Sequence, residues 1–593
     1  MKKIINIILP CFMVFFTSCE DDFIDLTPLA SITEDVYFSE PIHYEQNANS
    51  FYRQMIAFRP TGGSNIADFM DYGTDLTSYT EGTQQDYGRG VVSLQQVDSY
   101  WNNAYSYIRA NNVLLKRAES YAGDVNDIKE YIAIAKFFRA WNYYFLVQRY
   151  GGVPLITKVL DTDSEELKSP RNSRYEVVAQ VLKDLEEAIV DLPLEQNIGT
   201  DNKGKLSKWA AMAFKGRVLL YEATWMKYVQ TSTDGDGVSM GAGSAGYSAS
   251  NVDTYLQEAV SVLKTVMDQG GYELWNYNSL LDNKSSFYLF NLEDGGSNPA
   301  GLDKSTNKEF ILYNKYDFDL YKGNTGLTHG ARGRLQPSRK MMDMFLCLDG
   351  KTINDSPLFK GYVKTSDEYQ NRDYRMRAYF ADYDTYEVPV DGSIVLNQQL
   401  STGYYNQKFC TYNYGEYRQT KEESADYPQI RLAAVYLMYA EALVELNGSL
   451  TDTQMSESIN KVKARAGLPA ISNSSLIANG MNIKDEIRRE RTIELYAENS
   501  RYVDLKRWGL AEEVLGEPIA GAVIEGTDYE NNAALYNPSS YQFGEISVAT
   551  GSGTLKAVQL DAVSNRNFSR TNYLHPLPTL QVGQTEVLQN PGY

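Results

Sequence analysis

The spacing of apolar residues before and within Ala135–Thr157 predicts a buried helix that ends sharply. Apolar side chains recur every three or four positions, the spacing of one helical face, at Ile128, Ile132, Ala135, Phe138, Trp141 and Phe145. Between positions 137 and 147 they also occupy the flanks, so we expect this helix to be covered on more than one face. Gly151 and Gly152 should end it, because Gly accepts the left-handed geometry of a helix stop, and Pro154 prevents its continuation.

The same periodicity predicts two groups of helices on either side of a loop-rich stretch. They are expected at about residues 98–121, 127–149, 173–191, 205–229 and 252–269, and again at about 428–447, 453–466, 483–498 and 501–512. Residues 271–427 should hold loops and short strands such as Glu309–Tyr316. The Gly/Ser-rich stretch Ser232–Ser250 is predicted to be a flexible spacer, and the tail to Tyr593 to be irregular. Helix pairs that stack on a shared core indicate a mainly α fold with a tetratricopeptide-like scaffold.

The beginning of the chain predicts an export signal rather than structure. Lys2-Lys3 is basic, and Ile4–Phe16 is apolar over the length of a signal peptide, too short to span a bilayer comfortably. Small residues precede Cys19, and this ending resembles a bacterial lipobox, although Phe16 stands where Leu is usual. We therefore predict a signal peptide at 1–18, an acylated tether at 19–40 and a single domain at 41–593. The alternative is an ordinary secretory signal with an incidental Cys.

Composition narrows the classes of partner. A net charge of −20 and a pI of about 4.8 argue against binding to nucleic acid or to an anionic membrane surface. The chain has 46 Tyr against 22 Phe and 6 Trp, and Tyr suits surfaces that hold polar ligands. An equally open interpretation is that many Tyr residues only hold long loops in place. With Cys19 acylated, Cys347 and Cys410 remain in the domain, and the sequence does not show whether they pair.

Five segments, in order along the chain, resemble the signatures of one family. They are Arg139–Leu155, Ile430–Gly448, Ile459–Pro469, Ile487–Gly509 and the terminus Gln589–Tyr593, which Pro576-Leu577-Pro578 precedes. The family is SusD/RagB, the nutrient-binding outer-membrane lipoproteins of Bacteroidetes. Glu20-Asp21-Asp22 after the lipobox Cys also resembles the acidic tag that sends such lipoproteins to the extracellular side of the outer membrane.

The resemblance implies both a fold and a function. The fold is SusD-like and mainly α, with tetratricopeptide-like helix pairs at about 98–269 and 428–512, a loop-rich ligand-binding face at about 271–427 and few short strands. The function is that of a non-catalytic, cell-surface lipoprotein that captures oligosaccharides and delivers them to a SusC-like TonB-dependent transporter. RagB-like members take peptides instead, and that alternative stays open at this point.

The charged residues of the fourth signature have a structural interpretation. Glu490, Arg491, Glu494, Arg501 and Asp504 lie on a predicted helix and the turn after it, where acids and bases can pair between neighbouring turns. As a catalytic pair, Glu490 and Glu494 would both be held ionised by the adjacent Arg residues, which is wrong for a general acid. We therefore predict ion pairs and no enzyme. A surface glycoside hydrolase, the third possibility, would need two carboxylates with different pKa values facing one cleft.

Other motifs do not predict chemistry. Residues 241–246 fit Gly-x-Gly-x-x-Gly, but no strand precedes them, so a dinucleotide site is not expected. The three His residues lack zinc spacing. Asp161–Glu165 and Asp234–Gly237 have calcium-like acid spacing without the Gly and distant Glu of a full loop. We predict no cofactor and no metal site.

A sugar is bound by stacking on aromatic rings and by hydrogen bonds from its hydroxyls to short polar side chains. Two stretches combine these residue types: the long loop 64–87, which runs into Trp101 and Asn102, and residues 313–334. The candidate ligand-binding residues are Asp68, Asp75, Tyr79, Trp101, Asn102, Trp275, Tyr321, His329 and Arg332. Trp101 and Trp275 are also plausible core residues.

Overall fold

The computed structural model describes residues 37–55, 71, 73–78, 86–322, 335–381, 402–410, 422–530, 544–551 and 553–593. The predictions for the signal peptide, for Cys19 and for Asp68, Tyr79, His329 and Arg332 lie outside these ranges. Within them, no helix combines the length and the apolar content needed to cross a membrane.

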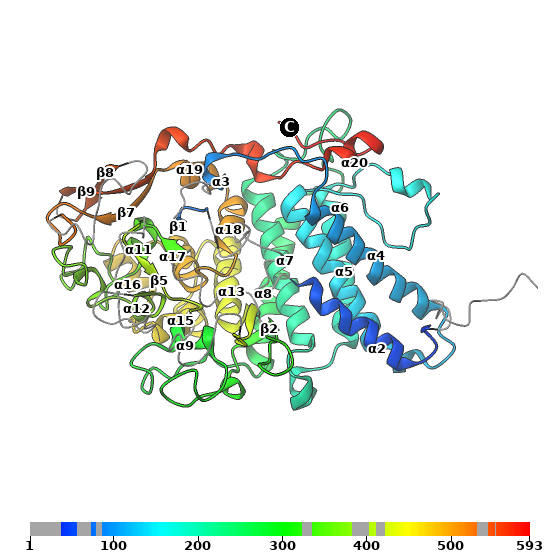
Figure 1. Ribbon diagram of the computed structural model, residues 1–593, viewed down its shortest axis with the longest axis horizontal. Helices are drawn as coiled ribbons and strands as arrows, with labels where there is room; N and C mark the ends of the chain where they lie inside the picture. The colour runs from blue at the N-terminus through cyan, green and yellow to red at the C-terminus, as the bar shows by residue number, and fades with distance from the viewer. Residues whose placement is uncertain are drawn as a thin grey trace, which may run out of the picture.

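Long helices packed side by side form the scaffold (Figure 1). Along the chain, α4 (Ser99–Glu119), α5 (Lys129–Tyr150), α6 (Arg174–Asp191), α7 (Lys208–Tyr228) and α8 (Asn251–Gln269) each pack on the next. Helix α8 then packs on α13 (Leu432–Asn447), and α13 on α17 (Ile483–Glu494). One helical layer therefore continues across the stretch that separates the two groups in sequence. This arrangement confirms the mainly α class.

Shorter elements surround this layer. The short helices are α2 (Pro41–Ser50), α3 (Asp86–Arg89), α9 (Ser285–Tyr288), α11 (Arg339–Met344), α12 (Tyr374–Tyr379), α14 (Asp452–Glu457), α15 (Ile459–Arg465), α16 (Asn473–Ala478), α18 (Arg501–Arg507), α19 (Ala511–Gly516) and α20 (Thr579–Gln584). The strands are β1 (Thr77–Ser78), β2 (Phe310–Asn314), β3 (Gln336–Pro337), β4 (Phe380–Ala381), β5 (Tyr405–Asn406), β6 (Tyr427–Arg431), β7 (Ile519–Val523), β8 (Glu545–Thr550) and β9 (Gly553–Asp561).

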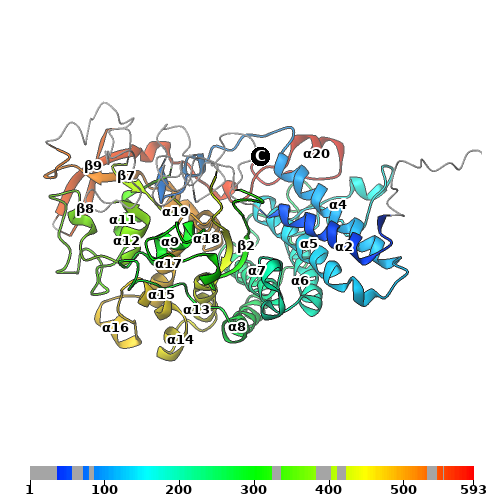
Figure 2. The ribbon, with the colours of Figure 1, turned by 60° about the horizontal axis from the view of Figure 1, so that its bottom comes forward.

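The strands form small antiparallel sheets: β1 with β3, β2 with β6, β4 with β5, and the three-stranded sheet β7–β9–β8. Figures 1 and 2 place the three-stranded sheet at one end of the molecule and α2, α4 and α5 at the other. The strand expected at Glu309–Tyr316 is confirmed as β2. The sequence pattern did not predict α2 or the sheet in the C-terminal tail.

The end of α5 is tied to the C-terminal segment of the chain. Gly151 ends the helix with φ +76°, as predicted. Arg171 donates to the carbonyls of Gly152 (Nε, 2.7 Å) and Tyr150 (Nη2, 2.8 Å) and to Asn590 Oδ1 (Nη2, 2.8 Å). Since α5 packs against both α4 and α6, the prediction that it is covered on more than one face is confirmed. The first and last family signatures thus meet in space.

Replacing Gly152 by Ala should lower the free energy of unfolding by about 1–3 kcal/mol. A Cβ there would lie 2.2 Å from the Asn172 carbonyl oxygen and 2.8 Å from the Arg174 nitrogen, and backbone atoms cannot swing aside. Urea denaturation measures the effect. Gly516→Ala is the matched control, because a Cβ at Gly516 meets nothing within 4 Å. Equal unfolding free energies for the two variants would show that the backbone at residue 152 adjusts without cost.

Helix boundaries in the second group differ from the prediction. Residues 427–431 form β6 rather than the first turn of α13, because Pro428 lacks the N–H of a helix interior and the segment pairs with β2. The helix expected at 453–466 breaks at Ser458, whose Oγ donates to the carbonyl of Gln454 (2.5 Å). The predicted 483–498 helix ends at Glu494. The helix predicted at 501–512 is divided into α18 and α19.

The stretch Ser232–Ser250 consists of hydrogen-bonded turns rather than a loose spacer. Asp236 Oδ1 accepts from the backbone N–H groups of residues 238–240, and Asp234 accepts from the Tyr175 hydroxyl (2.8 Å). The Gly241 N–H donates to the Gln589 carbonyl (2.6 Å). These acids therefore organise turns, which corrects the expectation of flexibility.

The loop-rich stretch has a core of its own. Buried aromatic and aliphatic side chains from residues 275–292, 335–345, 369–380 and 404–410 pack into one cluster beside the helical core. Cys410 is buried in this cluster and Cys347 is buried as well, and both are free thiols, so they do not form a disulfide. Burial of this second core packs the loop-rich stretch against the helices.

Candidate functional site

A cleft of about 1380 Å³ is lined by residues from both halves of the chain. Helices α4, α5 and α7 contribute to it from the first group. Strands β2 and β6, helix α18 with the residues before it, and Pro576 and Pro578 contribute from the second. The cleft is thus located where the helical layer meets the loop-rich stretch and the C-terminal tail.

Half-buried aromatic side chains line the part of the cleft formed by α4 and α5. They are Tyr100 and Tyr107 on α4 and Trp141 and Phe145 on α5. The rings of Tyr100 and Phe145 lie 5.8 Å apart between centroids, and the Arg149 guanidinium stands 4.1 Å from the Tyr100 centroid. Partly exposed rings that line a cleft offer apolar surface on which the C–H face of a sugar ring can stack.

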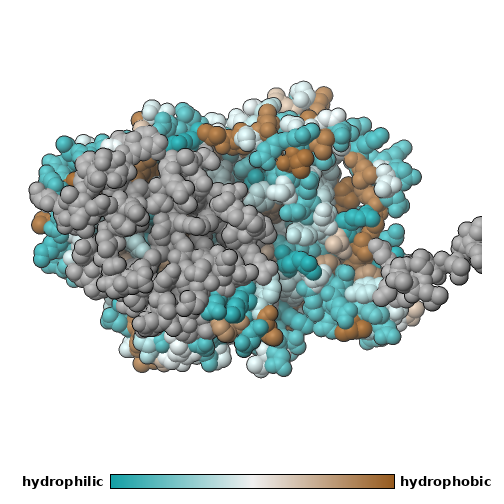
Figure 3. All heavy atoms as spheres, in the orientation of Figure 1, coloured by the Kyte–Doolittle hydropathy of each residue, from teal (hydrophilic) through white to brown (hydrophobic). Residues whose placement is uncertain are grey.

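Uncharged polar groups share the cleft with these rings. They belong to Asn103, Gln148, Asn202, Gln429, Asn499 and Ser500. Amides and hydroxyls can both donate to and accept from sugar hydroxyls. The described surface on the face in Figure 3 is mainly hydrophilic, and the apolar Val91, Leu94 and Val97 are exposed just before α4.

Of the described candidate residues, Tyr321 lines the cleft. Its side chain is 49% exposed, and its ring is nearly parallel to that of Tyr316, with centroids 5.9 Å apart and an interplanar angle of 11°. The Tyr321 backbone exchanges two 2.9 Å hydrogen bonds with Asp317, which forms a tight turn after β2. Asn102 is exposed at the start of α4, next to the cleft residue Asn103.

Three other described candidates, Trp101, Trp275 and Asp75, are buried. Trp101 is 5% exposed and packs edge-on against Tyr150. Trp275 is 2% exposed and its Nε1 donates to Thr306 Oγ1 (3.0 Å). Asp75 is buried in a bidentate ion pair with Arg501 (2.9 and 2.7 Å), so its oxygens are occupied. These placements favour structural roles for all three.

Sequence reasoning missed the aromatic residues of α4 and α5 because it assigned Trp141 and Phe145 to the core. A signal for them exists in the spacing. Tyr100, Asn103 and Tyr107 lie at i, i+3 and i+7, a mixed aromatic and polar stripe beside the apolar face of the same helix. A stripe of this kind, facing a similar one on the next helix, indicates a surface that is both apolar and hydrogen-bonding.

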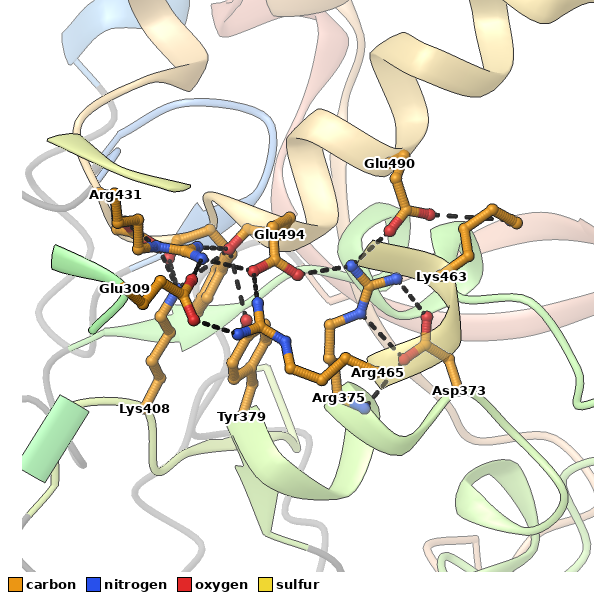
Figure 4. Close-up of polar contacts among 12 residues, drawn as sticks. Glu309, Asp373, Arg375, Tyr379, Lys408, Arg431, Lys463, Arg465, Glu490 and Glu494 are labelled. Carbon is orange, nitrogen blue, oxygen red and sulfur yellow. Dashed lines mark hydrogen bonds and ion pairs between the residues drawn. The ribbon is translucent and has the colours of Figure 1, made fainter. Parts of the chain in front are cut away.

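A buried network of charges surrounds Glu494 behind the cleft, and Arg431 belongs both to this network and to the cleft lining (Figure 4). Glu494 accepts from Arg375 (2.8 Å), from Arg431 (2.6 Å) and from Arg465. Arg375 also binds Glu490 (2.6 Å). The prediction of ion pairs is confirmed, but the partners are wrong in one respect: these bases come from α12, β6 and α15 rather than from neighbouring turns of α17.

The field in this network keeps Glu494 ionised. Burial alone would raise the pKa of its carboxyl group, but Arg465, Arg431 and Arg375 lower that pKa far below its usual range. A carboxylate so strongly ionised cannot serve as a general acid near neutral pH. The arrangement is suited to holding α12, α15, α17 and β6 together.

Two families of known proteins match this chain. Residues 300–593 match the SusD family, and residues 23–220 match a family described as starch-binding and associating with the outer membrane. The chain belongs to the SusD/RagB family. SusD-like protein P25 of Formosa agariphila is 21% identical to it, over 86% of this chain and 91% of that protein. A SusD-like protein of Bacteroides ovatus is 22% identical, over 84% of this chain and 80% of that protein.

Solved structures share the same architecture. A SusD-like carbohydrate-binding protein of Bacteroides fragilis superimposes with a TM-score of 0.67 at 20% identity, over 92% of this chain and 98% of that one. A laminarin-binding SusD-like protein gives a TM-score of 0.58 at 22% identity, over 94% and 100% of the two chains. These similarities confirm the SusD-like fold.

Proposed function

We propose that this SusD-like protein binds oligosaccharides in the cleft, on the cell surface, without hydrolysing them. The observation that carries the proposal is the set of half-buried rings on α4 and α5, which shares one cleft with amides and with Tyr321. The aromatic rings provide apolar contact with a sugar ring, and the amides form hydrogen bonds that fix its orientation. Proteins bind uncharged sugars in this way. The glycan binding stated in the names of two solved relatives supports this choice of ligand class.

The proposed role continues with delivery to a SusC-like TonB-dependent transporter. Acyl chains on Cys19 would hold the protein on the extracellular side of the outer membrane, where both glycan and transporter are within reach. Replacing Cys19 by Ala should release the protein from the outer-membrane fraction. A variant that stays in that fraction would argue against the lipid anchor.

Affinity electrophoresis tests the ligand and the absence of catalysis together. The purified protein should migrate more slowly in gels that contain a bound polysaccharide, tested with laminarin, starch, xylan and pectin. Incubation with the same polysaccharide should release no new reducing ends. Released reducing ends would contradict the non-catalytic role. Unchanged mobility in every gel, together with binding of a mixed peptide pool, would favour the RagB-like peptide alternative.

Replacing Tyr107 or Tyr321 by Ala should weaken the retention by a polysaccharide about tenfold, because a stacked aromatic ring contributes about 1–1.5 kcal/mol. Both side chains line the cleft, on α4 and after β2 respectively. Tyr247→Ala is the control, since that half-buried ring packs on Tyr175 outside the cleft lining. If all three variants bind like the parent, the glycan does not occupy this cleft. A loss confined to Tyr107→Ala would restrict the site to α4 and α5.

A further inference from the structure

The cleft has the opposite charge balance from the whole chain. Among its described lining residues ten are basic and five are acidic, whereas the chain has 56 Lys and Arg against 76 Asp and Glu. The basic residues are Arg53, Arg149, Lys203, Lys205, Arg217, Lys315, Arg431, Arg491, Lys506 and Arg507. The acidic ones are Asp71, Asp98, Asp201, Glu498 and Asp504. Salt screens charges more than about 8–10 Å apart, so a ligand in the cleft experiences these groups more than the distant acidic surface.

Three guanidinium groups, those of Arg507, Arg491 and Arg217, belong to cleft-lining residues, and the first two bind the carboxylates of Glu441 and Asp504. Arg507 binds both oxygens of Glu441 (2.5 and 2.9 Å) and also Asp504 (2.8 Å). Arg491 is 7% exposed and its Nε donates to Asp504 (2.6 Å). Arg491 lines the cleft, and its buried Nη1 has no hydrogen-bond partner among the described residues. An unsatisfied N–H of this kind costs free energy unless a ligand or water supplies an acceptor.

Arg217, on α7, is the third of these groups. Its Nη2 donates to the carbonyl of Gln429 (2.6 Å), and within the described ranges no carboxylate forms an ion pair with it. The pKa of Arg217 is lowered to about 10, first by burial and also by the nearby positive charge of Arg491. Arg217 therefore stays charged at neutral pH, near the like charge of Arg491. The acids that act on it, Asp504 and Glu498, form their ion pairs with Arg491 and Arg431 instead.

We propose that Arg217 and the free Nη1 of Arg491 hold an acidic substituent of the bound glycan, a uronate carboxylate or a sulfate ester. This proposal rests on the glycan-binding function proposed above and specifies its ligand class. Guanidinium groups present several N–H donors in a plane and bind carboxylate and sulfate oxygens with short, charge-assisted bonds. The acid would supply the acceptor that Arg491 lacks and would separate the two positive charges. Tyr144 and Tyr221, two buried aromatic residues, also line the cleft.

The test compares each acidic polysaccharide with its neutral counterpart. Isothermal titration calorimetry would measure binding of polygalacturonate against carboxyl-reduced polygalacturonate, and of dextran sulfate against dextran, in 50 mM and 300 mM NaCl. We expect the protein to bind at least one acidic polymer at least tenfold more tightly than its neutral form. Tighter binding of polygalacturonate than of its carboxyl-reduced form identifies a uronate. Tighter binding of dextran sulfate than of dextran identifies a sulfate.

Arg217→Met should remove most of that preference and reduce the loss of affinity with salt, since one charge fewer meets the ligand. Arg217→Lys should restore part of it. The matched control is Arg109→Met: Arg109 also donates to a carbonyl, that of Leu160 (2.6 Å), but from an exposed site outside the cleft lining. Unfolding curves for each variant separate loss of binding from loss of structure.

Every result decides the proposal. Equal affinity for acidic and neutral forms would overturn it and leave glycan binding in place. A preference for acidic polymers that Arg217→Met does not reduce would also overturn it. No binding of any polysaccharide would overturn both this proposal and the function on which it rests.

Discussion

Replacing Glu494 by Gln is expected to lower the free energy of unfolding by about 3–5 kcal/mol, the usual cost of breaking a buried ion pair from one side. The Glu494 side chain is fully buried and its carboxylate accepts from three guanidinium groups. Gln has the same shape but no charge, so it would leave Arg431 and Arg465 with Glu309 as their shared acid. The variant therefore tests the charge and not the packing.

Chemical denaturation at pH 7 measures this effect. The control is Glu166→Gln, because Glu166 pairs with Lys158 (2.5 Å) on the surface, where the two side chains are 44% and 66% exposed. An exposed pair contributes at most about 1 kcal/mol. If the two variants lose equal stability, the desolvation of the buried charges cancels their attraction, and the network specifies geometry without adding net stability.

The network also bears on the cleft. Arg431 lines the cleft and binds Glu494 and Glu309, while Glu498 lines the cleft and binds Arg431 (2.7 Å) and Lys408 (2.8 Å). The buried charges behind the cleft and the polar groups in it are thus one connected structure. We expect substitutions in the network to weaken ligand binding only as far as they disturb the folded structure of the cleft.

The sequence predicted the long helices because the information for them is local. The periodicity of α4 to α8 and the Gly residues after α5 set the helix positions to within a few residues. The errors occur where distant segments decide. Residues 427–431 become a strand because β2 lies beside them, and the partners of Glu494 come from segments up to 119 residues away.

The candidate site was predicted less well for the same reason. Loop composition selected Tyr321, which lines the cleft, but it also selected Trp101 and Trp275, which neighbouring elements cover. Whether an aromatic residue on a helix is core or cleft depends on what packs over it. Trp141 continues the buried face of α5 in sequence, yet it lines the cleft. The apolar spacing of α5 alone does not carry that information.

Glu441 provides a second large effect, and one that depends on pH. Its carboxylate on α13 accepts from Arg507 and from Trp508 Nε1 (2.7 Å), and so joins α13 to α18 beside the cleft. Although burial would raise the pKa of Glu441, Arg507, Arg491 and Trp508 lower it to about 2. Compared with an ordinary pKa of about 4.3–4.5, this shift corresponds to about 3 kcal/mol of stability. Glu441→Gln should lose that amount at pH 7.

The sign of the pH dependence makes the prediction specific. A carboxyl group whose pKa is lower in the folded state stabilises the fold above its unfolded pKa, and this stabilisation is lost as the pH falls toward the folded value. The difference in unfolding free energy between the parent protein and Glu441→Gln should therefore shrink from about 3 kcal/mol at pH 7 to about half of that at pH 3. Glu457→Gln, at an exposed ion pair with Lys264 (3.7 Å), should show a small difference throughout. A difference for Glu441→Gln that is the same at pH 7 and pH 3 would mean that its hydrogen-bond geometry, rather than its charge, holds α13 to α18.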